Sequence, residues 1–421
     1  LPMSILIKNV LHQNRRVDVL IKDGRFEKIA PDTEAPADKL IDGSDKAIVP
    51  AFYNTHCHAA MSILRGYGDD KPLFAWLRED IWPVEARLTP DDVYVASRLA
   101  ILEMIKSGTV FFADMYFYGE ETMRAVKEMG IRAAVSLVEM DMFDPEQTKS
   151  KMATTERFLA ADNPCPERIV KGLSCHAVYT VSSELLAFAA RTAEENGLTM
   201  QIHLSETAGE NAECLEKYGV TPTERLDSFG LLTPRTTLAH AVHLNRRDVE
   251  IIGERGSFLS HNPVSNLKLN SGLFAFEDLY HRLPGKVTIG TDGASSNNNL
   301  SMIESVKFAS LAAKCQADSA VAGKAADVFR AATSNGAAAF RLNAGEIREG
   351  ASADCLLVDL NNPFMVPAYN LVSDLVYAAD SSSIADVICN GRLVMEDRRV
   401  EGEAEIVAEA RKLAEKIINL K

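Results

Sequence analysis

The chain has 421 residues, 47% of them hydrophobic and 25% charged, which is typical of a folded globular protein and excludes a disordered or fibrous one. Its formal net charge of -14 would repel a phosphate backbone, so we expect no nucleic-acid polymer as a partner. No uninterrupted apolar run approaches the roughly 18 residues of a membrane span, so no membrane partner is expected either. Seven scattered cysteines without a CxxC pair favour reduced thiols and a cytoplasmic location.

Both ends of the chain alternate apolar and polar residues in short runs, which is the pattern of small antiparallel strands. Near the carboxyl end the segments ADCLLVDL, DLVYAA and ADVICNGRLVMEDRRV have this pattern, and Asn390-Gly391 is a strong hairpin signal. We expect residues 3–50 and 345–421 to form one small β-sandwich domain. The last segment, EAEIVAEARKLAEKIINL, has apolar residues at helical spacing and predicts a terminal amphipathic helix.

Between residues 51 and 344 short apolar runs alternate with longer helical stretches, which is the pattern of repeated βα units. The candidate strands are AIVPAFYNTH, TVFFADM, RAAVSL, IVKGLSCH, LTMQIHLSE, TTLAHAVH, SFLSHN and KVTIGTDG. Eight such units predict an α/β fold, a distorted TIM (β/α)8 barrel. Nearly every strand finishes in a polar or ionisable residue, and these are His56, Asp114, His176, His203, His240, His261 and Asp292. In such a barrel these ends converge on the catalytic face.

His56 and His58 lie two residues apart on the first of these strands, so their side chains point to one side while Cys57 faces away. Taken alone, the pair is as compatible with a chance HxH as with a metal site. His203 and Asp292, at the ends of the fifth and eighth strands, add an imidazole and a carboxylate that suit zinc or ferrous iron. We therefore predict that these four residues bind one divalent metal per chain, zinc before iron or manganese.

Two further residues near these ligands suit proton transfer. Glu206 follows His203 by three residues, just beyond the strand, where it could face a substrate; a solvated loop glutamate is an equally good interpretation of its position. His240 ends the sixth strand, where a neutral imidazole is a natural proton acceptor, although a structural histidine is the alternative. We predict Glu206 as the general acid, with His240 and Asp292 as proton acceptors.

The motifs THCHAAMSILRGYGDD, HLSETAGE, AHAVHL, SHNPVSNLKLNSG and GTDGASSNNNLSM resemble, in order and spacing, those of the methylthioadenosine/S-adenosylhomocysteine deaminase branch of the amidohydrolase superfamily. The similarity covers nearly the whole chain, including the tail AGEIREGASADCLLVDL. It implies the same four metal ligands and the same roles for Glu206 and His240. Some barrels of this superfamily bind two metals through a lysine on the fourth strand. Here the only lysine in IVKGLSCH, Lys171, lies well before its end, so we predict a mononuclear site.

The resemblance also implies substrate contacts. Trp76 matches a position at the pocket wall, Glu85 a carboxylate that holds ribose hydroxyls, and His176 a histidine that hydrogen-bonds the purine. Glu206 would contact the purine while protonating it, and Arg132 matches an arginine near the substrate tail. Core packing, a helix-surface glutamate and a structural strand-end histidine are the alternatives for the first three.

The segment after Arg132 departs from the family pattern. Members that accept the homocysteine carboxylate use a further arginine there, whereas LVEMDMFDPEQTKSKM offers only Lys149 and Lys151. Because a buried carboxylate prefers a bidentate guanidinium to a flexible lysine, we predict a small or thioether 5′ substituent. A homo-oligomer is also expected, and a neighbouring subunit could supply the missing arginine.

The functional hypothesis is a hydrolytic deaminase that converts an adenosine-type nucleoside to its inosine analogue and ammonia. The candidate substrates are methylthioadenosine, S-adenosylhomocysteine, adenosine and 5′-deoxyadenosine. An alternative is an aminohydrolase of another heterocycle, such as guanine, 8-oxoguanine, a pterin or a chlorotriazine. A non-catalytic metal-binding barrel is a third interpretation, but it would be expected to lose ligands or Glu206. The HxE motif and cysteine ligands of cytidine-type deaminases are absent from the sequence.

Overall fold

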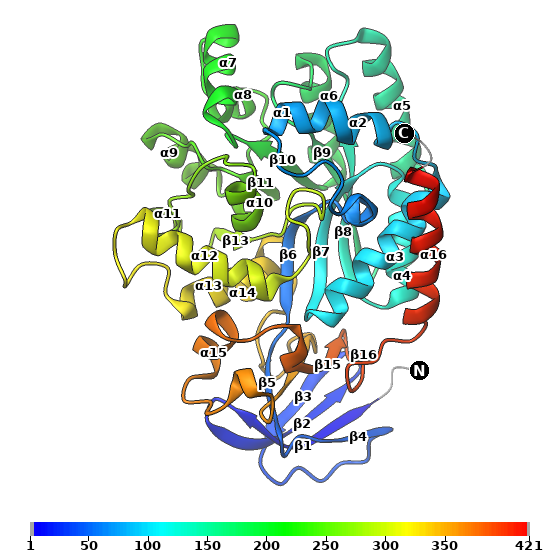
Figure 1. The fold of residues 1–421 in the computed structure, drawn as a ribbon, viewed down its shortest axis with the longest axis vertical. Helices are drawn as coiled ribbons and strands as arrows, with labels where there is room; N and C mark the ends of the chain where they lie inside the picture. The colour runs from blue at the N-terminus through cyan, green and yellow to red at the C-terminus, as the bar shows by residue number, and fades with distance from the viewer. Residues whose placement is uncertain (1–3, 419–421) are drawn as a thin grey trace.

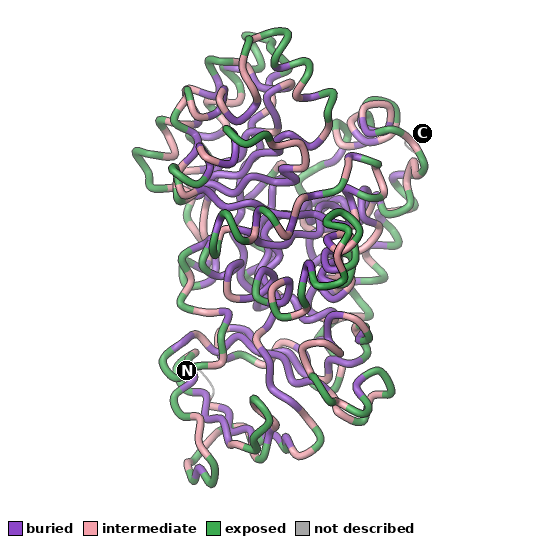
Figure 2. Tube along the Cα trace, turned by 90° about the vertical axis from the view of Figure 1, so that its left-hand side faces the viewer, coloured by how far each residue is buried: buried purple, intermediate pink, exposed green. Residues whose placement is uncertain are grey.

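The computed structural model describes residues 4–418 and divides the strands between two eight-stranded sheets (Figure 1). Met3 and residues 419–421, which belong to the ranges expected for the small domain, lie outside the described residues. Within residues 4–418, no helix combines the length and the apolar character needed to cross a membrane. Buried segments run through the interior and exposed segments lie mainly at the periphery (Figure 2).

One of the two sheets is the barrel predicted from the βα alternation. Its parallel strands follow one another in chain order: β6 (Phe52–Cys57), β7 (Thr109–Tyr116), β8 (Arg132–Glu139), β9 (Ile169–Cys175), β10 (Thr199–Leu204), β11 (Thr236–His240), β12 (Phe258–His261) and β13 (Val287–Ile289). The last strand returns to the first, because the Asp292 amide donates to the His56 carbonyl at 3.0 Å and the Thr55 and Thr288 hydroxyls bond at 2.7 Å. The eightfold barrel is confirmed.

Helices surround the barrel, and several of them begin at a residue whose side chain accepts from a free amide of the first turn. In α3, for example, Thr89 and Asp92 form a capping box with Pro90 in the first turn. The segment from β6 to α3 contains η1 (Ala59–Leu64), α1 (Leu73–Trp76), η2 (Leu77–Ile81) and α2 (Trp82–Glu85). The remaining helices of the barrel are α3 (Pro90–Lys106), α4 (Gly119–Met129), α5 (Pro145–Ala160), α6 (Ser183–Asn196), α7 (Ala208–Tyr218), α8 (Pro222–Ser228), α9 (Arg246–Arg255), α10 (Pro263–Lys268), α11 (Phe276–Arg282), α12 (Met302–Gln316), α13 (Ala325–Ala332) and α14 (Ser334–Ala339).

The other sheet, the sheet of the small domain, joins the two ends of the chain, as the sequence predicts. Its amino-terminal strands are β1 (Ile5–His12), β2 (Arg15–Lys22), β3 (Arg25–Ala30), β4 (Lys39–Asp42) and β5 (Lys46–Pro50). Its carboxyl-terminal strands are β14 (Cys355–Asp359), β15 (Ile384–Cys389) and β16 (Arg392–Met395), and β5 pairs with β14 in antiparallel register. The short turns η3 (Pro363–Met365) and η4 (Ser381–Ser383) and the helix α15 (Leu371–Tyr377) connect the later strands. The expected small β domain built from both ends is confirmed.

The terminal helix is also confirmed as α16 (Glu403–Ile418). It leaves the small sheet and runs beside α3 on the barrel (Figure 1). Ion pairs between Arg98 and Glu409 at 2.5 Å and between Asp92 and Lys416 at 2.6 Å join the two helices. The carboxyl-terminal segment therefore contributes β16 to the small domain and packs α16 against the barrel.

Two predicted strands were wrong in detail. DLVYAA lies largely in α15, where the Asn370 side chain accepts from the Ser373 amide as an N-cap, and Leu375 and Val376 are buried. A short apolar run fits a helix turn as well as a strand, so tertiary packing decides. AIVPAFYNTH is two strands, because β5 ends at Pro50 in the small sheet and β6 starts at Phe52 in the barrel.

Candidate active site

Four predicted ligands from three strands meet in one buried cluster. His56, His58, His203 and Asp292 each offer one ligand atom, and these atoms lie within 4.8 Å of one another. Asp292 Oδ1 is 3.2 Å from His58 Nε2 and 3.6 Å from His56 Nε2. Nε2 of His203 lies 3.3 Å from Nε2 of His58. The carboxyl ends of β6, β10 and β13 therefore place one carboxylate oxygen and imidazole nitrogens around a common point.

The hydrogen bonds of the outer ring nitrogens make the cluster suitable for a metal. His58 Nδ1 donates to the Met115 carbonyl and His203 Nδ1 to the His176 carbonyl, both at 2.7 Å. Because a carbonyl only accepts, each Nε2 is left with an inward lone pair. The Nε2 of His56 is buried and has no hydrogen-bond partner. Nitrogens at about 2.0 Å from a tetrahedral zinc would be about 3.3 Å apart, and the donor set fits a divalent transition metal.

Asp292 is oriented by its own hydrogen bonds. Its Oδ2 accepts from the hydroxyls of Ser265 at 2.6 Å and Ser296 at 2.9 Å, and its Oδ1 accepts from the Gly293 amide at 2.8 Å. Asp292 and His240 have left-handed backbone conformations, with φ of 63° and 70°. Such strain in residues other than glycine is typical of functional sites.

His240 and Glu206 lie beside the cluster. His240 Nε2 is 3.7 Å from Glu206 Oε2 and 3.8 Å from Asp292 Oδ2. His240 Nδ1 donates to Asn266 Oδ1 at 2.7 Å, so Nε2 is free to accept a proton. Glu206 Oε1 accepts from the Ser271 hydroxyl at 3.0 Å, and burial raises the pKa of the Glu206 carboxyl. A carboxyl that keeps its proton nearer to neutral pH is suited to act as an acid.

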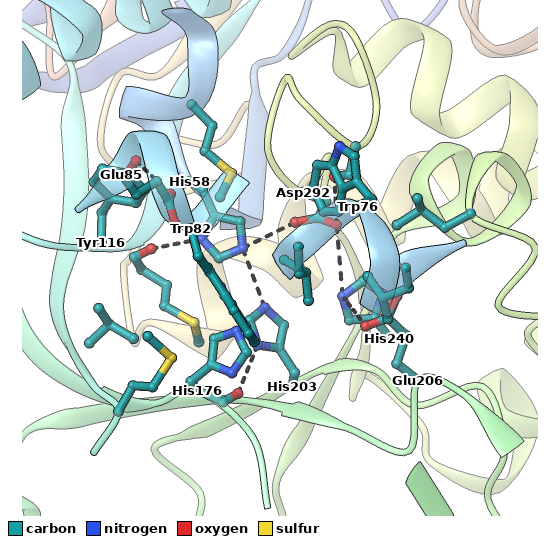
Figure 3. A pocket seen from close by; sticks show the side chains of 18 of the residues that line it. His58, Trp76, Trp82, Glu85, Tyr116, His176, His203, Glu206, His240 and Asp292 are labelled. Carbon is teal, nitrogen blue, oxygen red and sulfur yellow. Dashed lines mark hydrogen bonds and ion pairs between the residues drawn. The ribbon is translucent and has the colours of Figure 1, made fainter. Parts of the chain in front are cut away.

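The pocket beside this cluster has a second carboxylate on its other side. Figure 3 shows Glu206 with His240 on one side of the pocket and Glu85 with Tyr116 on the other. Glu85 is half-buried, and its Oε1 accepts from the Tyr116 hydroxyl at 2.7 Å. Burial raises the pKa of Glu85 to about 7, although the hydrogen bond from Tyr116 opposes this. The pocket therefore has a carboxyl group on each of two sides, Glu206 on one and Glu85 on the other.

Aromatic and imidazole rings form the wall between these carboxylates. Trp76, Trp82 and His176 line the pocket, as Trp76 and His176 were expected to do. The rings of Trp82 and His176 lie 6.5 Å apart in an edge-to-face arrangement, and His176 Nδ1 lies 2.8 Å from the Thr180 hydroxyl. Burial and the neighbouring histidines lower the pKa of His176 to about 3, so its imidazole is neutral. These rings suit a flat heterocycle with hydrogen-bonding edges.

The chain is similar in sequence to known proteins. A model described as the amidohydrolase family matches residues 47–394. The chain belongs to the amidohydrolase family. It is 41% identical to a 5-methylthioadenosine/S-adenosylhomocysteine deaminase of Thermococcus sibiricus, over 93% of this chain and 94% of the relative. It is also 41% identical to a 5′-deoxyadenosine deaminase of Methanosphaera stadtmanae, over 94% of each chain.

A solved structure matches the fold of this amidohydrolase as well. The crystal structure of an adenosine deaminase from Xanthomonas campestris with bound zinc has a TM-score of 0.91 and 31% sequence identity, and the match covers 99% of this chain and 98% of that one. The resemblance drawn from the sequence motifs is confirmed, and the chain is a hydrolase of this family. The interpretation as a non-catalytic barrel loses its support, since relatives that match more than nine tenths of this chain are deaminases.

Arg132 does not reach the pocket of the amidohydrolase, and the expected contact with the substrate tail is corrected. It is the first residue of β8, at the end of the barrel opposite the metal cluster. Its Nε donates to Asp354 at 3.1 Å, and the other guanidinium nitrogens bond to the Glu167 carbonyl, Ser352 and Asn390. Arg132 therefore joins the barrel to the small domain.

We expect Arg132→Met to lower the free energy of unfolding by about 3 to 5 kcal/mol, because it leaves the buried Asp354 without its charged partner. Turnover and KM of the folded enzyme should stay unchanged. Thermal unfolding and steady-state kinetics measure both effects, with Lys149→Met, which removes an exposed pair with Glu146, as the control. A raised KM at unchanged stability would restore the substrate role.

The sequence did not single out several residues that orient the site. Asn266 and Ser271, which hold His240 and Glu206, lie in the motif SHNPVSNLKLNSG, but nothing in its spacing tells which polar side chains point inward. Tyr116 and Trp82 were missed for the same reason. The signal that could have found them is their place in or next to the recognised motifs.

Proposed function

We propose that this amidohydrolase replaces the exocyclic amino group of an adenosine-type nucleoside with oxygen, yielding the inosine analogue and ammonia. The observation that carries the proposal is Glu85, which lies across the pocket from Glu206 and His240. A carboxylate can accept hydrogen bonds from both ribose hydroxyls, and a free base has no such hydroxyls. The nucleoside deaminases at 41% identity support the same assignment.

We propose one divalent metal per chain, zinc first, bound by His56, His58, His203 and Asp292. When bound, it supplies Lewis-acid activation of a water molecule. The zinc in the related adenosine deaminase structure supports this choice. Lys171 supports a mononuclear site, because its ammonium donates to the carbonyls of Phe158 and Ala161 instead of facing the cluster.

The side chains around the cluster divide the proton transfers between them. His240, with Nε2 free and close to Asp292 Oδ2, accepts the proton of the attacking water. Glu206, fixed by Ser271, donates a proton to the ring nitrogen adjacent to the reacting carbon, so that charge does not build up on the purine. His176 is neutral and can hydrogen-bond the purine edge. The amino group then takes the proton held by His240 and leaves as ammonia when the C–N bond breaks. The new hydroxyl forms the C=O bond and returns its proton to Glu206.

A second cavity adjoins the pocket at Glu85, and we propose that a 5′ substituent lies towards it. It has a volume of about 450 Å³ and contains no residue of the metal cluster. It shares Trp82, Glu85, Phe117, Val138 and Met140 with the pocket, so the two lie side by side. Its other lining residues are mostly apolar: Ala86, Tyr118, Leu137, Met142, Lys151 and Thr154.

The one cation of this cavity already has acidic neighbours. Burial lowers the pKa of Lys151, and the charges of Glu139 and Asp141 oppose that shift. Lys149 lies at the surface in a pair with Glu146 and does not line the cavity. A homocysteine carboxylate therefore gains little here, and we propose a small or thioether substituent without charge at the 5′ position.

Ammonia release from a panel of substrates tests the proposal. We expect methylthioadenosine, 5′-deoxyadenosine or adenosine to match or exceed S-adenosylhomocysteine in kcat/KM, with free adenine, guanine and 8-oxoguanine far behind. Glu85→Ala should lower kcat/KM for nucleosides roughly tenfold to a hundredfold, as the loss of hydrogen bonds to a charged group predicts. Glu79→Ala, which removes an exposed glutamate of η2, is the control.

Two outcomes would contradict the proposal in different ways. A free base that outperforms every nucleoside would refute the role of Glu85 and favour another amino-heterocycle. A strong preference for S-adenosylhomocysteine would refute only the uncharged substituent. The homo-oligomer and the cytoplasmic location stay predictions; sedimentation at several protein concentrations tests the first.

A further inference from the structure

Glu210 is a buried carboxylate that the proposed reaction does not use. It lies in the first turn of α7, is 1% exposed, and does not line the pocket. Both of its oxygens are engaged by backbone amides. The Ser205 amide donates to Oε1 at 3.0 Å, and the Glu206 amide donates to Oε2 at 2.8 Å. Its carboxylate thus binds the segment that carries the proposed acid.

As the third residue of α7, Glu210 would be expected to accept from the amide of the N-cap residue Thr207 instead. Thr207 is the N-cap, and its hydroxyl accepts from the Glu210 amide at 3.1 Å. In a capping box the third helical residue returns a bond to the N-cap amide, as Asp92, Glu224 and Asp248 do in α3, α8 and α9. In α7 the carboxylate instead reaches the two amides that precede the N-cap.

These two amides belong to a strained turn. Ser205 has a left-handed backbone with φ of 46°, which is unfavourable for a residue other than glycine. Its carbonyl accepts from the amides of Val242 at 3.1 Å and His243 at 2.9 Å. Successive amides in such a turn form a concave site for an anion, and the Glu210 carboxylate occupies it. Strain of this kind persists only where the surroundings enforce it.

We propose that Glu210 is a positioning residue that holds the turn at Ser205 so that the Glu206 side chain faces the pocket. The turn separates the ligand His203 from Glu206 by two residues, so its shape decides where the acid points. With the turn held, Glu206 reaches Ser271 at 3.0 Å and His240 at 3.7 Å. This inference rests on the proposed role of Glu206 as the acid.

Glu210→Gln tests the inference, because the amide keeps one acceptor oxygen and sets its NH2 group against a backbone N–H. We expect kcat to fall about tenfold to a hundredfold, which is part of what a general acid supplies, with KM and metal content unchanged. Glu224→Gln is the matched control, since it removes the same carboxylate from the capping box of α8. It should lower the melting temperature without lowering kcat.

A double variant separates positioning from general stability. If Glu210 acts through Glu206, adding Glu210→Gln to Glu206→Gln should cost no further turnover, because coupled residues are not additive. Should Glu210→Gln fail to fold, Glu210→Asp, which keeps the charge but cannot reach both amides, should lower kcat at unchanged KM.

Three results would overturn the inference: normal kcat in the folded Glu210 variant, loss of metal from it, or an additive loss in the double variant. Normal turnover in Glu206→Gln alone would instead refute the proposed acid.

Discussion

Removal of the metal is expected to lower turnover at least about a thousandfold, since Lewis-acid activation of water supplies several kcal/mol. The four residues of the cluster have ligand atoms within 4.8 Å of one another, and no second cluster of this kind is found among the described residues. Activity should return on addition of one equivalent of zinc per chain. Metal analysis, with kinetics before chelation, after it and on reconstitution, measures the effect.

Two outcomes of that experiment would contradict the mononuclear assignment. One is full activity after complete chelation, and the other is a requirement for two equivalents per chain. The melting temperature should fall on chelation, because a ligand that binds only the folded state stabilises it. His281→Asn is a control, since this exposed histidine pairs with Glu277 away from the cluster.

Glu206→Gln is expected to lower turnover at least about a hundredfold, because a general acid typically supplies 10² to 10⁴ in rate. The glutamine keeps the size of the side chain and can still accept from the Ser271 hydroxyl, so the fold and the metal should be retained. The variant lacks the carboxyl proton that Glu206 is proposed to donate to the purine ring nitrogen. Steady-state kinetics with metal analysis and a binding measurement for the inosine product test this expectation.

The control for this variant is Glu213→Gln, which changes an exposed glutamate of α7 only two turns along the chain. It should have normal turnover. Near-normal turnover in Glu206→Gln with metal retained would show that another group delivers the proton. Loss of metal from Glu206→Gln would also contradict the assignment, because it would make Glu206 a ligand.

The strand-end residues show which features of the site the sequence pattern predicts and which it does not. Asp114 and His261 lie near the carboxyl ends of barrel strands, as His203 does, yet neither belongs to the cluster of potential metal ligands. Oδ1 of Asp114 accepts from the Ala59 amide at 2.8 Å, and His261 stacks on Phe274 at 4.3 Å. Periodicity places a residue at the catalytic face, but it cannot tell whether the side chain turns inward or packs against a neighbour.

Arg132 shows a limit of another kind. Its agreement with a family motif placed it near the substrate tail, while its position at the start of β8 places it at the far end of the barrel. The guanidinium meets Asp354, which is 222 residues away in the chain. A residue's partner across such a separation follows from the packing of the two domains and is not encoded in local spacing.

The sequence by itself determined the barrel and the small domain built from both ends, and it predicted the four residues that lie in one cluster. These depend on local rules: βα alternation, the two-residue repeat that puts His56 and His58 on one side of a strand, and the meeting of parallel strand ends at one face. Only the tertiary structure decided which side chains orient the site. Ser271 and Asn266 each reach the site through one hydrogen bond from a distant segment, and the Glu210 carboxylate accepts from two nearby amides. Such bonds depend on ångström-scale approach and on side-chain direction.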